Sequence, residues 1–328
     1  MARIEADDHS GIFVSHDYPE RTADLGEIRM NYATAGEADL PALVVVPGQS
    51  ASWWSYQDAM PLLAGHFHVY AVDLRGQGRS TWTPGRYTLD NMGNDLVRFL
   101  DVVVGRPAII SGNSSGGLLA AWLAAFGKPG QVRGALLEDA PVFAAETTPA
   151  YGHSIRQAIG PVFACWNKWL GNQWTIGDWA GMHAAMPKEL PPYLLAGLAA
   201  MATKKPGAPP PDFSVPPQNL REYDPEWGRA FVSGTATAGC DHAMMLAGAR
   251  APMLYTHHFR AIDPGSGALL GAASDEQVTR ARELVTGAGQ PFEVVSLPEM
   301  AHAMHEHDPK LFTQLLTDFA QRLADDGR

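Results

Sequence analysis

The sequence predicts an α/β fold built on a parallel, doubly wound sheet. Short apolar runs alternate with longer helix-like windows over about the first 140 residues and again after about residue 250. Such alternation is typical of βαβ units, in which helices cover both faces of a parallel sheet. With 328 residues, 46% of them hydrophobic and 18% charged, the chain can bury one large core. We expect one sizeable domain with an insertion, or two smaller domains.

The expected elements follow in a regular order. The early strands are Ile12–Val14, Ile28–Tyr32, Leu43–Val46, His68–Val72, Pro107–Ile110 and Val132–Leu137. The helix-like windows between them are Tyr56–Ala64, Leu89–Val103 and Gly116–Phe126. The later elements are the strand Met253–Thr256, the helix Asp275–Val285 with Ser274 as N-cap, the strand Phe292–Leu297 and the closing helix Pro309–Leu323.

The alternation of strand-like and helix-like segments stops from residue 141 to about 250. This segment holds five tryptophans, several methionines and the prolines 206, 209, 210 and 211. The pattern predicts an inserted, mostly helical lid with one proline-stiffened loop. We therefore assign residues 1–141 and 251–328 to the core domain and 142–250 to the cap.

Charge and composition exclude several classes of partner. The net charge is −11 and no basic tract stands out, which argues against nucleic acid and anionic membranes. The acidic N-terminus does not read as a secretory signal, and no apolar run reaches membrane-spanning length, so we expect a cytoplasmic protein. Cys165 and Cys240 lie far apart in sequence and are expected to be buried thiols.

The most informative string is Gly112-Asn113-Ser114-Ser115-Gly116. It follows an apolar strand-like run and opens an Ala/Leu-rich helix, which predicts a tight turn with Ser114 at its apex. Glycines on both sides let the backbone fold back closely and expose the hydroxyl. Ser114 is therefore the candidate nucleophile; the alternative is an ordinary glycine-rich turn.

A serine nucleophile needs a base, and the loop after the last predicted strand supplies histidines. His302 is the best placed, with His305 as its main rival, while His305 and His307 can also be solvated loop residues. Together with Asp308 these histidines could be metal ligands, but their spacing matches no known zinc pattern. We expect no metal and no organic cofactor.

The acid that orients the base has several candidates. Asp139 closes the apolar strand next to the nucleophile strand, and Glu138 would point to the opposite face if the strand continues. Asp263 follows the next strand, which is the usual place in this kind of fold, but its Asp-Pro-Gly-Ser-Gly context is typical of a turn.

The loop after Leu43–Val46 is expected to help bind a developing oxyanion. Ser115 would donate one backbone N–H, and Gln49, or else Ser50, would donate the second, because Pro47 has no N–H and Gly48 serves the turn. Trp53 and Trp54 follow and could line an apolar pocket, although tryptophans are more often core residues.

These residues carry a family resemblance. The string Asp73-Leu74-Arg75-Gly76-Gln77-Gly78-Arg79-Ser80, the Ser114 turn and the late His302 resemble the α/β-hydrolase superfamily over nearly the whole chain. Segments 52–56, 112–123, 138–141 and 222–231 further resemble bacterial zearalenone lactonases. The resemblance implies an α/β-hydrolase fold with a mostly parallel eight-stranded sheet, helices on both faces and an inserted helical cap.

The same resemblance implies a reaction. It is hydrolysis of the macrocyclic lactone ester of zearalenone, a resorcylic acid lactone, to a hydroxy acid that can lose carbon dioxide. It favours Asp139 as the acid, because the acid after the sixth strand serves in the related fungal lactonases. Where those relatives carry Asp-Gly in the loop after the third strand, this chain has Gly48-Gln49.

We expect a small apolar lactone or ester as substrate, with a homodimer as a possible assembly. The residues expected to contact substrate are Gly48, Trp53, Trp54, Val142, Phe143 and Ala303. The rival functions are a general carboxylesterase or carbon–carbon-bond hydrolase with the same triad, and a ligand receptor that turns over slowly. Dehalogenase and epoxide hydrolase chemistry is disfavoured because Ser114 stands where an Asp nucleophile would be required.

Overall fold

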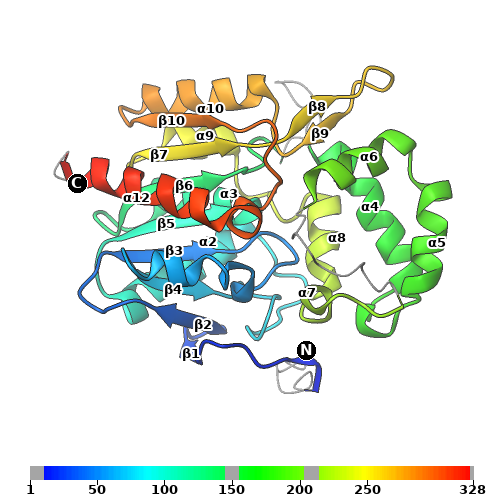
Figure 1. Cartoon of the computed structure of the whole chain (residues 1–328), viewed down its shortest axis with the longest axis horizontal. Coiled ribbons are helices and arrows are strands. Elements are labelled where there is room, and N and C mark those ends of the chain that lie inside the picture. The colour runs from blue at the N-terminus through cyan, green and yellow to red at the C-terminus, as the bar shows by residue number, and fades with distance from the viewer. Residues whose placement is uncertain (1–10, 145–154, 203–213, 326–328) are drawn as a thin grey trace.

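One eight-stranded sheet forms the centre of the molecule in this computed structural model, which describes residues 11–144, 155–202 and 214–325 (Figure 1). The strand order is β1-β2-β4-β3-β5-β6-β7-β10. β1 pairs antiparallel with β2, and β2 antiparallel with β4, whereas the other neighbours pair in parallel. The strands are β1 Glu20–Asp24, β2 Arg29–Ala35, β3 Ala42–Val46, β4 His68–Val72, β5 Ala108–Asn113, β6 Val132–Glu138, β7 Met253–His257 and β10 Phe292–Ser296. The predicted fold class is confirmed.

One predicted strand is wrong. Ile12–Val14 forms no strand, and the first strand of the sheet is instead β1, Glu20–Asp24. Its sequence, Glu-Arg-Thr-Ala-Asp, buries only Ala23 and pairs with β2 on one side. An edge strand with so little burial has no apolar run to mark it, and so sequence periodicity does not find it.

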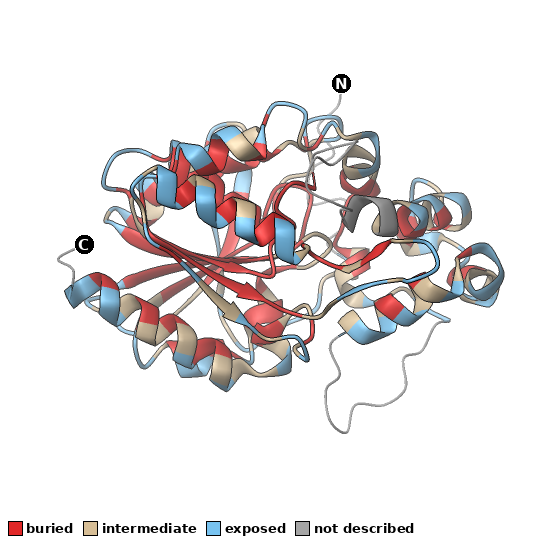
Figure 2. Cartoon of the chain, turned by 90° about the horizontal axis from the view of Figure 1, so that it is seen from above, coloured by how far each residue is buried: buried red, intermediate tan, exposed pale blue. Residues whose placement is uncertain are grey.

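Helices cover both faces of the sheet, as predicted. The core helices are η2 Trp53–Tyr56, α1 Met60–Leu63, α2 Leu89–Phe99 with the π-helical turn η3 Leu100–Val104, α3 Ser115–Phe126, α10 Asp275–Gly287, α11 Met304–His307 and α12 Pro309–Asp325. Alternate residues of β3 serve the two faces. Val44 and Val46 pack with α2 and α3, and Leu43 and Val45 pack with α1 and α12. Every residue of β3 is buried for this reason, and Figure 2 shows the central strands buried between helices.

A helical insertion lies between β6 and β7, at one end of the sheet (Figure 1). Its described elements are α4 Ile155–Leu170, η4 Trp174–Ile176, α5 Trp179–Glu189, α6 Pro192–Met201, α7 Gln218–Arg221 and α8 Pro225–Ser233. α9, His242–Ala247, packs on α3 and α10 of the core. The small hairpin β8 Arg260–Ile262 and β9 Leu269–Gly271 contacts α4 and α6. The proline-rich stretch 206–211 lies outside the described residues, and the exact cap boundaries stay a prediction.

Two smaller expectations concern the cysteines and membrane segments. Cys165 and Cys240 are both buried and free, which confirms the predicted buried thiols. Within the described ranges, none of the helices combines the length and the apolar character needed to cross a bilayer.

The segment Glu222-Tyr223-Asp224 fastens the insertion to the core. The N–H of Asp224 donates to the Gly76 carbonyl at 2.9 Å, and its carboxylate accepts the Tyr87 hydroxyl at 2.5 Å. The Glu222 carboxylate accepts the Trp54 indole N–H at 3.0 Å. Because these groups are largely buried, their hydrogen bonds fix the position of the insertion over the carboxyl ends of the strands.

We predict that Tyr87→Phe lowers the free energy of unfolding by about 1–3 kcal/mol, because it removes one hydrogen bond from the buried Asp224 carboxylate. Urea unfolding followed by circular dichroism measures this loss. Tyr193→Phe is the matched control, because no hydrogen bond is found for its hydroxyl among the described residues. Equal stability of the two variants would contradict the anchoring role.

Candidate active site

Ser114 lies at the sharp turn between β5 and α3. Its backbone angles, φ 54° and ψ −122°, are strained for a residue with a side chain. Its N–H donates to the Glu138 carbonyl at 2.8 Å, which holds the turn against β6. A Cβ on Gly112 would lie 2.1 Å from the Gly116 carbonyl oxygen, and one on Gly116 would lie 2.3 Å from the Val46 oxygen. Both glycines are therefore required for this turn.

Asp139, which follows β6, and His302, which lies in the loop after β10, form a close pair. His302 Nδ1 lies 2.6 Å from Asp139 Oδ2. The other carboxylate oxygen of Asp139 accepts the His258 N–H at 3.1 Å. Asp139 is buried at the end of β6, and the His302 side chain is 23% exposed. The carboxylate thus fixes the imidazole and leaves its Nε2 available toward the pocket described below.

The two pKa values shift in opposite directions. Burial by itself raises the pKa of Asp139, but the hydrogen bond and charge of His302 outweigh it and lower the pKa. Burial by itself lowers the pKa of His302, but the hydrogen bond and charge of Asp139, with a contribution from Glu138, raise it above its usual value of 6.5. The pair therefore favours an imidazole that readily accepts a proton.

The rival residues lie elsewhere. His305 is buried against Glu138, with its Nδ1 2.9 Å from both carboxylate oxygens. His307 ends α11 and is exposed. Asp263 sits in the β8–β9 turn, where it accepts the Ser266 N–H at 2.7 Å, as its sequence context suggests. Of the three carboxylates considered, only Asp139 is paired with His302 among the described residues.

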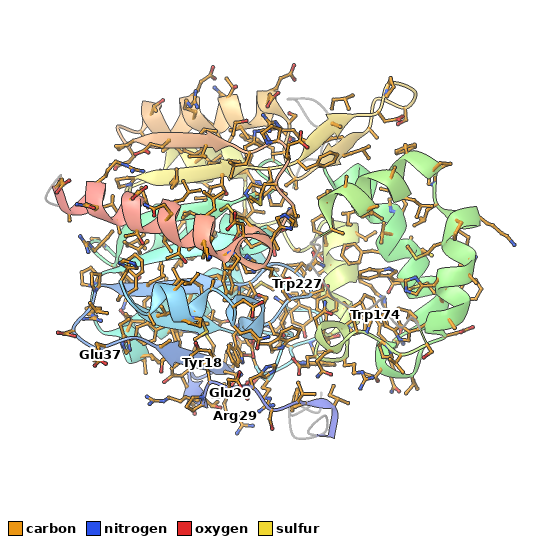
Figure 3. All side chains as sticks on the ribbon, viewed as in Figure 1. Tyr18, Glu20, Arg29, Glu37, Trp174 and Trp227 are labelled. Atoms are coloured by element: carbon orange, nitrogen blue, oxygen red, sulfur yellow. The ribbon has the colours of Figure 1, made fainter. Side chains whose placement is uncertain are left out.

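Ser114 and His302 open on one cavity of about 250 Å³. The insertion covers it with helices α4, α6 and α8, and Trp227 of α8 faces the end of the sheet (Figure 3). The described lining residues are Gln49, Ser50, Leu89, Ser114, Ser115, Leu118, Pro141, Ala144, Ile159, Phe163, Trp166, Leu198, Met201, Ala202, Trp227, Phe231, Ala236, Thr237 and His302. Most of these side chains are apolar, so the cavity suits an apolar molecule with one polar reacting group.

Residues whose backbone N–H groups are free in the described part of the chain border the same cavity as Ser114. Ser115 begins α3, where a helix leaves its first N–H groups without partners. Among the described residues, the N–H groups of Ser115, Gln49 and Ser50 donate to no other protein atom. The Gln49 side chain donates to the Tyr223 hydroxyl at 2.7 Å. The 222–224 segment of the insertion therefore also holds the loop after β3. The structure thus leaves both sequence alternatives, Gln49 and Ser50, as second donor.

None of the six residues predicted to contact substrate is among the described residues that line the cavity. Trp53 is fully buried, and Trp54 stacks on His16. Val142 and Phe143 are also fully buried, because they continue the chain inward from β6. Ala303 is the N-cap residue of α11. None of these five residues borders the described part of the cavity.

Gly48 packs closely against the turn that carries Ser114 and is not among the described residues that line the cavity. A Cβ there would lie 2.9 Å from Asn113 Oδ1 and 3.1 Å from the Ser114 Cβ. Sequence reasoning missed the cap residues Ile159, Phe163, Leu198 and Phe231. The sequence placed these residues in a tryptophan-rich insertion, but it did not show which faces of its helices turn toward Ser114.

No cluster of three or more His, Cys, Asp or Glu side chains suited to a metal ion is found in the described ranges. His302 is instead paired with Asp139, His305 is paired with Glu138, and His307 is exposed. In the described residues, Ser114 and His302 border one cavity, and the carboxylate of Asp139 is paired with His302.

Comparisons with known proteins identify the family of the chain and relatives of its fold. The sequence model of the family described as Alpha/beta hydrolase family matches residues 43–315. The chain is 34% identical over 98 residues to 3-oxoadipate enol-lactonase 2 of Acinetobacter baylyi, a match that covers 30% of this chain and only 37% of the relative.

Solved structures are similar over almost the full chain. A hydrolase from Pseudomonas aeruginosa superposes with a TM-score of 0.60 at 19% identity, covering 93% of this chain and 99% of that one. The enol-lactonase from Burkholderia xenovorans gives a TM-score of 0.56 at 18% identity, covering 92% and 100%. At these identities the similarity shows the fold.

We predict that Asp139→Asn slows covalent labelling of Ser114 by a fluorophosphonate by roughly 10⁴-fold, because the imidazole loses its orienting charge. Mass spectrometry of the labelled peptide measures the rate. In the unchanged protein the rate should fall as pH drops below the pKa of His302, above 6.5, since the protonated imidazole accepts no proton. Asp263→Asn is the control and should label normally; the reverse ranking would move the acid to Asp263.

Proposed function

The chain belongs to the alpha/beta hydrolase family, and on that premise we propose that it hydrolyses carboxylic esters through an acyl-enzyme on Ser114, with a zearalenone-type macrocyclic lactone as substrate. The observation that carries the proposal is that His302, paired with Asp139 at 2.6 Å, borders the same apolar cavity as Ser114.

The proposed reaction has two halves. His302 Nε2 takes the proton of Ser114 Oγ as that oxygen attacks the lactone carbonyl carbon. The N–H groups of Ser115 and of Gln49 or Ser50 stabilise the resulting oxyanion. The carbon–oxygen bond to the alcohol then breaks, and His302 gives its proton to the leaving oxygen.

The ring opening leaves an acyl-enzyme whose hydroxyl end belongs to the same molecule. Water then attacks the acyl carbon while His302 again accepts and returns a proton, which releases the hydroxy acid and restores Ser114. Asp139 keeps the imidazole oriented throughout, and its charge stabilises the imidazolium in both halves.

Two observations support an apolar lactone as substrate. The cavity is covered by cap residues such as Phe163, Trp166, Trp227 and Phe231, which can pack against an aromatic ring. The nucleophile, Glu138-Asp139 and 222–231 strings resemble those of zearalenone lactonases. A curated relative and a solved neighbour that are named enol-lactonases act on a different kind of lactone, so they support lactone chemistry in general.

We predict that the protein depletes zearalenone over many turnovers, giving the ring-opened acid seen by liquid chromatography and mass spectrometry. Ser114→Ala should abolish the loss while circular dichroism shows a folded protein, because only the nucleophilic oxygen is removed. Ser115→Ala is the matched control: its hydroxyl is buried and has no hydrogen-bond partner among the described residues, and its backbone N–H is kept.

Other outcomes favour the rival functions. Hydrolysis of p-nitrophenyl esters with zearalenone unchanged would favour a general carboxylesterase. Stoichiometric binding of zearalenone without repeated turnover would favour a receptor. The cytoplasmic location and the homodimer stay predictions.

A further inference from the structure

Glu138 contacts both the turn that carries Ser114 and the short helix that follows His302, and it takes no part in the proposed reaction. Its side chain is fully buried, and its carboxylate accepts the backbone N–H of His305 at 2.9 Å and faces the His305 ring nitrogen Nδ1 at 2.9 Å. Its backbone carbonyl accepts the Ser114 N–H at 2.8 Å. One residue therefore holds both the nucleophile turn and the helix that follows His302.

The same network continues to the loop that offers oxyanion donors. The His305 ring stacks on Tyr56 with ring centroids 4.0 Å apart. The Tyr56 hydroxyl donates to the Val46 carbonyl at 2.9 Å, and Val46 is the last residue of β3 before the Pro47–Ser50 loop. A continuous set of buried contacts thus runs from Glu138 to that loop.

We infer that Glu138 is a positioning residue, which sets the relative placement of Ser114, His302 and the oxyanion loop by holding His305. The inference rests on the proposed function. The backbone of His302 is fixed independently, since Asn113 Nδ2 donates to its carbonyl at 2.9 Å.

The negative charge of Glu138 also affects His302, through the pKa of its imidazole. Several charged or titratable groups face the two pairs. Among the described residues they include Asp139, Glu138, His258, His302, His305, Glu306, Tyr56 and Tyr255. Glu138 is one of the groups that raise the pKa of His302. Removing its charge should therefore lower that pKa and extend activity toward acid.

The test is Glu138→Gln, which keeps size and one acceptor oxygen. We expect kcat on a p-nitrophenyl ester to fall about 10- to 100-fold with KM within about twofold, because misplacement affects the transition state more than ground-state binding. The acidic limb of the pH profile should move to lower pH. Tyr56→Phe should lower kcat by a smaller factor and leave that limb in place, because it removes only the bond to Val46.

Asp95→Asn is the matched control. Asp95 is a buried carboxylate paired with Arg75 at 2.6 Å in the core, and it does not border the cavity. Rates are expressed per fluorophosphonate-labelled site, so partial unfolding is separated from catalysis. A Glu138→Gln enzyme with unchanged kcat and pH profile, or the same kcat loss in Asp95→Asn, overturns the inference. A wild-type protein that labels at Ser114 but hydrolyses no ester overturns the proposed function, and the labelling rates of the variants still test Glu138.

A second observation concerns a small cavity beside the main one. Its described lining residues are Ile159, Leu194, Gly197, Leu198, Met201, Leu270 and Gly271, and none of them has a polar side chain. Ile159, Leu198 and Met201 also line the catalytic cavity, so the two spaces share a wall of apolar side chains. The small cavity measures about 20 Å³, close to the size of one methyl group or water molecule.

Its place relative to His302 indicates which half of an ester it serves. The backbone N–H of His302 donates to the Met201 carbonyl at 3.0 Å, so the end of α6 lies next to His302. In the proposed reaction His302 returns its proton to the leaving oxygen. The alcohol half of the substrate therefore lies on the α6 side.

We propose that this cavity is a subsite for a short alkyl branch on the alcohol carbon of the ester, which rests on the proposed function. The apolar lining offers no partner to water but favours a methyl group. The preferred substrates are then esters of secondary, methyl-bearing alcohols, in which the branch enters the subsite as the ring or chain occupies the main cavity.

The test is a series of benzoate esters with methyl, ethyl, isopropyl and sec-butyl alcohols. We expect kcat/KM to rise about fourfold when a branch methyl becomes buried. Gly197→Ala should remove this rise, because its Cβ would meet the Leu270 Cδ2 at 2.8 Å and take up the space. Acyl-chain preference, measured with p-nitrophenyl esters, should not change.

Gly160→Ala is the matched control, since it is another cap glycine where an added Cβ meets no atom of the described residues within 4 Å. Leu270→Ala enlarges the cavity and should shift the optimum to longer branches. Two results would overturn the subsite. One is a wild-type kcat/KM that does not change with branching of the alcohol, and the other is a Gly197→Ala effect of equal size on the acyl and alcohol series. Absence of hydrolysis of every ester would overturn the proposed function instead.

Discussion

The hydrogen bond between Asp139 and His302 is the contact on which the arrangement at the carboxyl end of the sheet depends. It joins the end of β6 to a loop 163 positions later in the chain. Because Asp139 is buried, its carboxylate without the imidazole would be a desolvated charge with fewer partners. The chain therefore favours the fold in which the last loop returns to β6, and that same loop carries the imidazole to the cavity that Ser114 borders.

Two adjacent carboxylates at the end of β6 each hold a different histidine. Asp139 holds the ring of His302, and Glu138 holds the ring and backbone of His305, on the other side of the strand. Glu138 is the last residue of β6, whereas Asp139 follows the strand with a φ of 46°, and the two carboxylates meet different histidines that lie only three positions apart in sequence. One pair borders the cavity, and the other is enclosed in the core.

The insertion and the core depend on each other. Tyr223 and Asp224 bind the loops after β3 and β4, while Met201 binds the backbone of His302. A cap fastened at these points does more than cover the cavity. Any shift of α6 or of the 222–224 segment would displace His302 and the loop that carries Gln49, because the hydrogen bonds involved are short-range and directional.

The sequence by itself determined the strand and helix order, the Ser114 turn and the helical nature of the insertion, because these follow from local periodicity and from glycines that only one turn geometry explains. It missed β1, whose polar alternation has no local apolar signal. It left Asp139, Glu138 and Asp263 open until a resemblance favoured one, and it did not identify the cap residues of the cavity. Only the tertiary structure decided which carboxylate meets which histidine and which tryptophans are core, because those outcomes depend on strand register and on helix packing between residues far apart in the chain.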